Sequence, residues 1–244
     1  MNPRLGIIPR ILAIPVFVLL FGLTSAQSSS TPALKSHGYR FSLSLPLALD
    51  TVAGSGAEIT YRKIFKSSFP EFVEIKIDES GSGTYDIRQL DDDPNPQPFE
   101  VGAPLAQRIF SLAAKLHNFQ TSDLDVHRRL ANLGEKTFQY EKGTEKYSTK
   151  FNYTLDDSAT QLVTIFEGLA RQTGDLSDLI RTMRYDRLGV NDVLMQIETE
   201  FNNKQLPEPE RLLPTLDKLA GDDKFIDIAR GRARTLAARI RAGH

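Results

Sequence analysis

The chain has 244 residues, of which 40% are apolar and 25% are charged, with 30 basic against 31 acidic side chains. This composition is typical of a soluble globular protein that forms one large or two small domains. No apolar run approaches the roughly 20 residues that span a bilayer, which excludes a multi-span membrane protein. The chain contains no cysteine, which excludes disulfides, thiolate metal sites and cysteine nucleophiles.

The N-terminus has the three zones of a secretory signal peptide over residues 1–26. Arg4 and Arg10 precede an apolar stretch over residues 11–23, and small residues lead to a predicted cleavage point between Ala26 and Gln27. An uncleaved anchor is the alternative. Because the sequence lacks cysteine, we expect a bacterial protein that is secreted or periplasmic, with membrane contact only through the transient signal peptide.

The charge that remains after cleavage gives no attraction to nucleic acid. Removal of residues 1–26 leaves 28 basic against 31 acidic residues, a net charge of about −3. We therefore expect no nucleic-acid partner.

Alternation of apolar and polar residues predicts strands in the first half of the chain. A polar linker over residues 27–38 precedes strands over residues 39–45 and 58–66. A hairpin is predicted over residues 73–87, with a glycine-rich turn. The run Asp91–Pro96 then interrupts regular structure.

Two amphipathic helices are predicted to follow the two hairpins. Leu105 to Phe119 shows apolar spacings of three and four, a second hairpin covers residues 138–155, and Asp156 or Asp157 can cap a helix that ends near residue 172. The sequence thus predicts an α+β domain over residues 39–172. Two strand-strand-helix units would form one antiparallel sheet with the helices on one face.

The last third of the chain, residues 173–244, predicts a small helical array. No strand is predicted from Gly174 onward, and helix breaks are expected at Gly189, Pro207–Pro209 and Gly221. The helices between them cover residues 176–183, 190–201, 212–219 and 225–240. Their short connections favour antiparallel neighbours.

Two resemblances follow from this layout. The doubled strand-strand-helix plan resembles small secreted bacterial domains of the PepSY and β-lactamase-inhibitor-like type, and the segment from Gly134 to Leu155 with its following helix is similar to uncharacterised secreted bacterial families. The segment from Leu212 to Leu236 resembles a single HEAT-type helical repeat, a scaffold module. These resemblances imply a binding or scaffold protein without a catalytic motif.

One cluster has the residue types of a metal or acid–base site. His117, Asp123, Asp125 and His127 supply two imidazoles and two carboxylates within eleven residues. Their spacing matches no helical metal pair. The structural alternative is a short helix over residues 124–133 that Ser122 or Asp123 caps.

The last predicted helix carries the strongest charge pattern. Arg230, Arg234 and Arg241 are candidates for binding an anionic surface or partner, together with Arg232 and Arg239. The alternative is that these cations complement the dipole at the helix C-terminus.

The sequence predicts no catalytic residue and no cofactor. The leading hypothesis is an exported, non-enzymatic binding or structural protein of the bacterial envelope, with another protein as its partner. The first alternative is a metal-dependent or acid–base hydrolase that uses the cluster from His117 to His127. The second alternative is an inhibitor-like module that caps the active site of another protein. The oligomeric state is not predicted.

Overall fold

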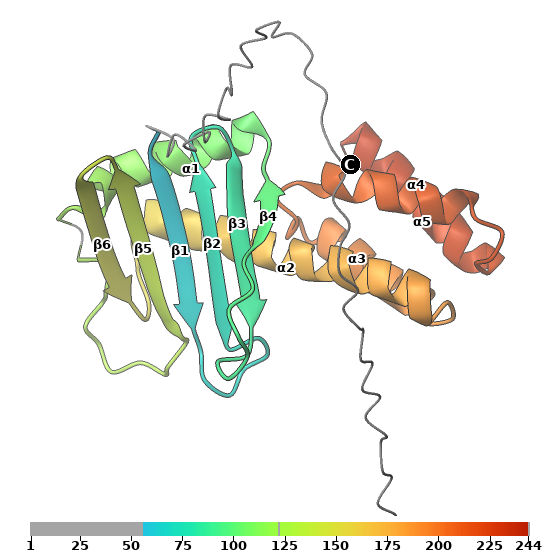
Figure 1. Cartoon of the computed structure of the whole chain (residues 1–244), viewed down its shortest axis with the longest axis horizontal. Coiled ribbons are helices and arrows are strands. Elements are labelled where there is room, and N and C mark those ends of the chain that lie inside the picture. The colour runs from blue at the N-terminus through green and yellow to red at the C-terminus, as the bar shows by residue number, and fades with distance from the viewer. Residues whose placement is uncertain (1–55, 122, 244) are drawn as a thin grey trace, which may run out of the picture. The chain divides into compact units, whose positions relative to one another are not determined.

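The computed structural model describes residues 56–121 and 123–243 of the chain (Figure 1). The predicted signal peptide, the linker and the strand over residues 39–45 lie outside the described residues. Within the described part, no helix has the length and apolar character needed to cross a membrane.

Six antiparallel strands form one sheet in the order β4-β3-β2-β1-β5-β6. The strands are β1 (Glu58–Ile64), β2 (Phe72–Asp78), β3 (Ser82–Arg88), β4 (Gln97–Glu100), β5 (Glu135–Lys142) and β6 (Glu145–Phe151). The chain returns after β4 through helix α1 (Ala103–Lys115), which allows β5 to pair with β1 at the centre of the sheet.

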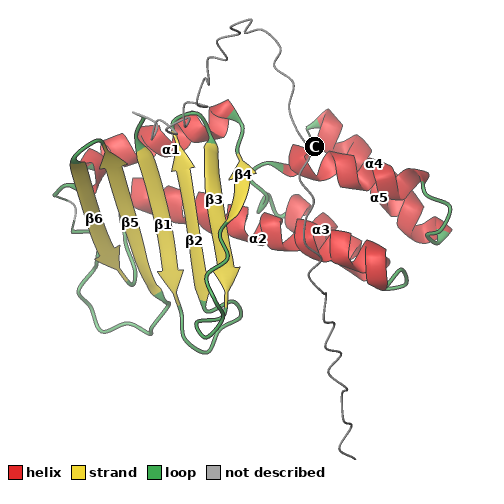
Figure 2. Cartoon of the chain, viewed as in Figure 1, coloured by secondary structure: helices red, strands yellow, loops and turns green. Residues whose placement is uncertain are grey.

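The helical elements after α1 are mostly in the last third of the chain. They are η1 (His117–Phe119), α2 (Asp157–Tyr185), α3 (Val190–Asn202), η2 (Pro209–Leu212), α4 (Leu213–Gly221) and α5 (Asp227–Ala242). Helix α1 and the first half of α2 lie behind one face of the sheet, and α3 to α5 gather beyond its β4 edge (Figure 2). The predicted α+β class, the antiparallel sheet with helices on one face and the C-terminal helical array are therefore confirmed.

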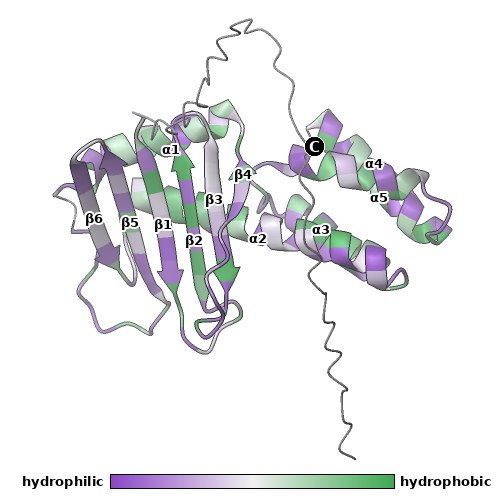
Figure 3. Cartoon of the chain, in the orientation of Figure 1, coloured by the Kyte–Doolittle hydropathy of each residue, from purple (hydrophilic) through white to green (hydrophobic). Residues whose placement is uncertain are grey.

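Alternation of side chains along the strands places the core on the helix side of the sheet. In β2, Val73, Ile75 and Ile77 are buried, whereas Glu74 and Lys76 lie on the opposite face (Figure 3). No helix of residues 56–121 or 123–243 packs against that opposite face, which is mostly polar (Figure 3). Beneath α2, the ring of Tyr61 stacks on Phe166 with 5.2 Å between the ring centroids.

Helix α2 contributes to two separate hydrophobic clusters. Leu162, Phe166 and Leu169 belong to the core between the sheet and the helices. Leu179 belongs to the core of the helical array, with Leu194 of α3 and Leu236 of α5. One helix of 29 residues therefore supplies side chains to both cores.

The prediction of two helices, one that ends near residue 172 and one over residues 176–183, is wrong, because α2 continues through both and includes Gly174. A glycine inside a helix costs only about 1 kcal/mol relative to alanine. The buried leucines on both sides of Gly174, Leu169 and Leu179, outweigh that cost by packing into their respective cores. The expected domain boundary between residues 172 and 173 thus falls inside a continuous helix.

Several predicted boundaries in the sheet domain are also wrong. Strand β4 follows directly after the proline-rich run and was not predicted, because it is short and contains Pro98. Helix α1 ends at Lys115, and Phe119 belongs to the separate turn η1. Strand β6 ends at Phe151, so that Tyr153 and Leu155 are exposed beyond it.

The short helix predicted over residues 124–133 does not form, and residues 123–134 connect η1 to β5 without regular structure. The carboxylate of Asp125 does not stabilise a helix N-terminus. Its Oδ1 instead accepts hydrogen bonds from the backbone N–H groups of Asn152 and Tyr153, 3.1 and 3.3 Å away. A contact distant in the sequence therefore replaces the local capping that the sequence pattern indicated.

Hydrogen bonds join α2 to the segment that connects α3 with α4. The side chain of Gln172 donates to the backbone oxygen of Glu208 at 2.5 Å and accepts from its backbone nitrogen at 3.1 Å. The Glu208 carboxylate in turn accepts from the backbone N–H of Gly102, at the start of α1, at 2.5 Å. Gly168 allows this close approach, since a Cβ there would lie 2.7 Å from Cγ of Pro207.

A pair of carboxyl groups lies where α2 packs on α3. Asp175 is buried near Glu200, and the amide of Gln196 donates to its Oδ1 at 3.0 Å. Burial and the nearby Glu200 raise the pKa of Asp175 to about 8. The buried oxygens Asp175 Oδ2 and Glu200 Oε2 have no hydrogen-bond partner among the described residues, and a proton on Asp175 removes the repulsion between two buried carboxylates.

The two glycines of α2 provide a matched pair of substitutions. Gly168→Ala and Gly174→Ala gain the same helix propensity, but only the first places a methyl group against Pro207. We expect Gly174→Ala to raise the free energy of unfolding by about 0.5–1 kcal/mol. We expect Gly168→Ala to lower it, as measured by urea denaturation. Equal effects of the two substitutions would contradict this account.

The pKa of Asp175 predicts a loss of stability as the pH rises. The folded state binds a proton that the unfolded state releases near pH 4, so this contribution is complete below about pH 4 and is lost as the pH rises to about 8. Asp175→Asn removes the titration and keeps the acceptor for Gln196. Urea denaturation should therefore show that Asp175→Asn stabilises the protein more at pH 8.5 than at pH 5.

Asp178→Asn is the control, because Asp178 is an exposed neighbour on the same helix and pairs with Arg181. Arg171, Asp178 and Glu200 are the charged groups around Asp175, and they stay unchanged in the Asp175 variant. A difference between wild type and Asp175→Asn that does not change with pH would show that Asp175 is already ionised in the folded protein.

Candidate functional site

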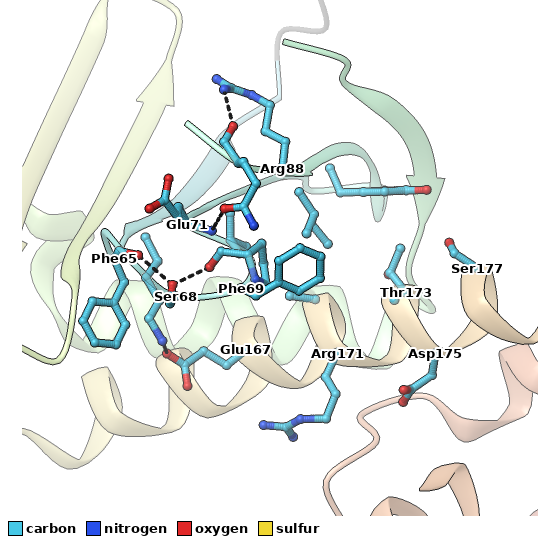
Figure 4. A pocket seen from close by; sticks show the side chains of 18 of the residues that line it. Phe65, Ser68, Phe69, Glu71, Arg88, Glu167, Arg171, Thr173, Asp175 and Ser177 are labelled. Atoms are coloured by element: carbon cyan, nitrogen blue, oxygen red, sulfur yellow. Dashed lines mark hydrogen bonds and ion pairs between the residues drawn. The ribbon is translucent and has the colours of Figure 1, made fainter. Parts of the chain in front are cut away.

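A groove of about 720 Å³ lies between the helix-facing side of the sheet and the middle of α2 (Figure 4). Val73, Tyr85 and Ile87 form its wall on the sheet. Ala170 and Gly174 form its wall on α2, and the loop between β1 and β2 closes one end. The groove is therefore mostly apolar at its centre, as is common for binding sites.

The groove exists because α2 presents small residues at this position. Phe166 and Leu169 fill the space between helix and sheet in the preceding turns. At Gly174, a Cβ would meet no atom within 4 Å, so the helix leaves this space open. Tyr85 and Ile87 consequently remain half-buried.

Phe69 projects from the loop at the mouth of the groove and is 91% exposed. The loop that carries it is held by hydrogen bonds. Phe65 N donates to Glu71 O at 2.8 Å, and the Glu71 carboxylate accepts from the backbone N–H groups of Ser67 and Leu90. Figure 4 shows the Phe69 ring beside α2, on the side of the helix from which Thr173 and Ser177 project. Because these hydrogen bonds order the loop, little further backbone entropy is lost when the Phe69 ring contacts a partner.

The charged groups in the groove are paired at its inner end. Lys63 Nζ lies 2.7 Å from Glu167 Oε1, and the hydroxyl of Tyr61 donates to the same oxygen at 3.2 Å. Burial and the negative charge of Glu167 raise the pKa of Tyr61 well above its usual range. Tyr61 is therefore a neutral phenol, and this group provides hydrogen bonding and orientation rather than a nucleophile.

Arg171 and Asp175 leave α2 on the side away from Phe69 (Figure 4). Asp175 is occupied by Gln196 and Glu200, as described above. The apolar centre of the groove is thus bordered by polar side chains that can orient a ligand at its edges.

The structure brings together three of the four residues of the predicted metal or acid–base cluster. His127 Nε2 lies 2.7 Å from Asp123 Oδ2, and His127 Nδ1 lies 3.8 Å from Asp125 Oδ2. His117 belongs to η1 and forms no ion pair with these three side chains in the part of the chain that the structure describes. Over residues 56–121 and 123–243, no group of three or more side chains is arranged to hold a metal ion.

Electrostatic contacts within this cluster favour the charged forms of its members. The hydrogen bond to Asp123 raises the pKa of His127 and lowers that of Asp123. Backbone amides of Tyr153 and Asn152 lower the pKa of Asp125. Asp123 and His127 are exposed and Asp125 is partly buried, and the hydrogen bonds of Asp125 attach the loop of residues 123–134 to the end of β6.

The predicted anion-binding arginines of α5 have partners inside the helical array. Arg230 pairs with Asp223 and Asp227, and Arg241 pairs with Asp217 at 2.5 Å. Arg234 donates to the backbone oxygen of Ala220 at 3.3 Å.

The other two arginines of α5 reach α3. Arg232 and Arg239 both pair with Glu198. These contacts hold α5 against α3 and α4, and they compete with any external anion for the same guanidinium groups.

The sequence analysis did not identify the groove. One signal for it was present, namely small residues at Ala170 and Gly174, four positions apart on a helix whose other inward positions are large. The exposure of Phe69 had no comparable signal, because it depends on hydrogen bonds between segments about 20 residues apart.

Comparison of the chain with models of known protein families and with curated proteins finds no match. The resemblances to PepSY and β-lactamase-inhibitor-like domains and to a HEAT repeat therefore stay predictions.

Proposed function

We propose that the protein is a non-enzymatic binding protein of the bacterial envelope or the secreted fraction, and that it holds an apolar side chain of another protein in the groove beside Phe69. The observation that carries this proposal is the 91% exposed ring of Phe69, on a loop held by hydrogen bonds, next to an open apolar groove. Export is supported by the signal-peptide pattern of residues 1–26.

Phe69 and the groove together have the features of a protein-binding hot spot. Aromatic anchors next to well-formed apolar pockets contribute a large share of the energy in many interfaces. The half-buried Tyr85 and Ile87 can be covered by one inserted side chain, while Arg171 and Glu71 are placed at the edge to select the orientation of the partner. No step in this function requires bond making or breaking.

The first test removes the exposed ring. Phe69→Ser should leave the melting temperature almost unchanged, because the ring contributes little to the core, and should weaken the complex about 30-fold, which corresponds to about 2 kcal/mol. The measurement is capture of partners from envelope extract by the wild-type chain, followed by titration of the captured partner. Leu155→Ser is the matched control, since Leu155 is 64% exposed and lies outside the groove.

The second test fills the groove from the side of the helix. Gly174→Leu directs a side chain into the open space and should weaken the complex at least about tenfold without unfolding the protein. Gly231→Leu is the control, because Gly231 is also inside a helix, α5, and also has no atom within 4 Å of its Cβ position. A partner that binds Gly174→Leu and Phe69→Ser as tightly as wild type would exclude the groove as the binding site.

A further inference from the structure

We infer that the end of the helical array binds the anionic surface of a phospholipid bilayer. The site is formed by the ends of α2 and α4 and by the connections that follow them, α2–α3 and α4–α5, which lie at the same end of the array (Figure 1). It is distinct from the groove beside Phe69 and does not depend on the function proposed for that groove.

A hollow of about 660 Å³ at this end of the array is lined by nine residues, of which four are cations. The cationic side chains are Arg184, Arg187, Lys218 and Lys224, against the single carboxylate of Asp222. The Asp222 carboxylate also accepts a hydrogen bond from the backbone N–H of Lys224 at 3.0 Å. Four like charges around one hollow repel each other, and an anion in the hollow relieves that repulsion.

The contrast with α5 shows that these cations are not used for internal pairing. Arg230, Arg232, Arg239 and Arg241 each have an acidic partner on a neighbouring element or turn. The four cations of the hollow have no ion pair in the part of the chain that the structure describes. Arg184 lies over the ring of its neighbour Tyr185, 5.3 Å from the ring centroid.

Exposed apolar side chains are concentrated in the same part of the chain, at the end of α2, the start of α5 and the connections beside them. Tyr185 and Leu188 are 74% and 75% exposed, and Ile180, Ile226 and Ile228 are also exposed. Five of the twelve large apolar side chains that are exposed in the described residues thus lie in the short segments 180–188 and 226–228. Exposed apolar groups concentrated in this way mark interaction surfaces.

The combination of cations with outward apolar side chains favours a bilayer over an acidic peptide. In a bilayer surface, phosphates lie beside the acyl boundary, so the cations and the apolar side chains find their partners at the same depth. The apolar residues lie in two separate segments, 180–188 and 226–228, so a broad surface can contact both at once. Arginine and lysine stems can extend along the apolar groups while their charges reach the phosphates.

The test is sedimentation of the full chain with vesicles at about 0.1 M salt. One vesicle contains phosphatidylcholine alone, and the other contains phosphatidylcholine with about 30% phosphatidylglycerol. We expect binding to the anionic vesicle, and an about 100-fold weaker affinity for the triple variant Arg187→Gln, Lys218→Gln and Lys224→Gln, since each basic residue contributes about fivefold at an anionic surface.

The matched control is the triple variant Lys66→Gln, Lys142→Gln and Lys204→Gln, which removes the same charge from exposed positions elsewhere. Residues 1–55 are identical in all variants, so any vesicle binding through them contributes equally to every measurement. Leu188→Ser, compared with Leu155→Ser, gives a second readout that keeps all charges and should weaken vesicle binding several-fold.

Three outcomes would overturn the inference. The first is equal loss of vesicle binding in the two triple variants. The second is competition of vesicle binding by inorganic phosphate at about 10 mM, which would assign the hollow to a free phosphate. The third is retention on immobilised polyglutamate without binding to anionic vesicles, which would assign it to an acidic protein.

Discussion

Helix α2 must satisfy two hydrophobic cores at once, and the rest of the structure depends on this constraint. At about 1.5 Å per residue its 29 residues span about 43 Å, which is longer than either core needs. Its first half is buried under the sheet through Phe166 and Leu169, and its second half packs in the array through Leu179. The residues between these halves pack into neither core. They are therefore available for polar contacts and for lining the groove.

The middle of α2 contains the residues that fasten the array and leave the groove open. Gly168 allows the α3–α4 connection to approach, and Gln172 then hydrogen bonds with Glu208 on that connection. Gly174 faces the groove from the neighbouring surface of the helix, while Asp175 is turned toward α3. One short stretch thus makes polar contacts on one side and leaves apolar space on the other.

Sequence reasoning succeeded where a local pattern and the tertiary contact agree. The alternation in β2 and the apolar spacing of α3 and α4 indicate burial, and the structure confirms them, whereas Ile228 of the predicted apolar stripe in α5 is 66% exposed. Sequence patterns failed where a distant contact decides the conformation. The stretch around Gly174 was predicted to separate two helices, because the packing of Leu169 and Leu179 into two different cores leaves no local signal. Asp125 lies in the helix predicted over residues 124–133, but it binds the amides after β6 instead.

The same difference explains why the candidate sites were hard to predict. The cluster from His117 to His127 and the arginines of α5 stand out because their residue types are rare or repeated in the sequence. In the fold they are engaged by neighbouring groups, Asp123 for His127 and Glu198 for Arg232. The groove and the basic hollow consist of ordinary residue types. They are candidate sites because no other part of the described chain covers the groove or pairs with the cations of the hollow. Unfilled space and unpaired charge are properties of packing, and single-sequence patterns do not report them.

The two proposed surfaces are connected by the same helix. Gly174, in the groove, and Arg184, at the hollow, are separated by ten residues of continuous helix, or about 15 Å along its axis. A continuous helix keeps the distance between the groove and the hollow constant. Attachment of the hollow to a bilayer would therefore hold the groove at a fixed height above the lipid phosphates. A partner that is itself anchored in the envelope would then meet Phe69 within a restricted layer, which raises its effective concentration without any added contact. The continuity of α2 through Gly174, which the sequence pattern argued against, is the feature that would make such an arrangement work.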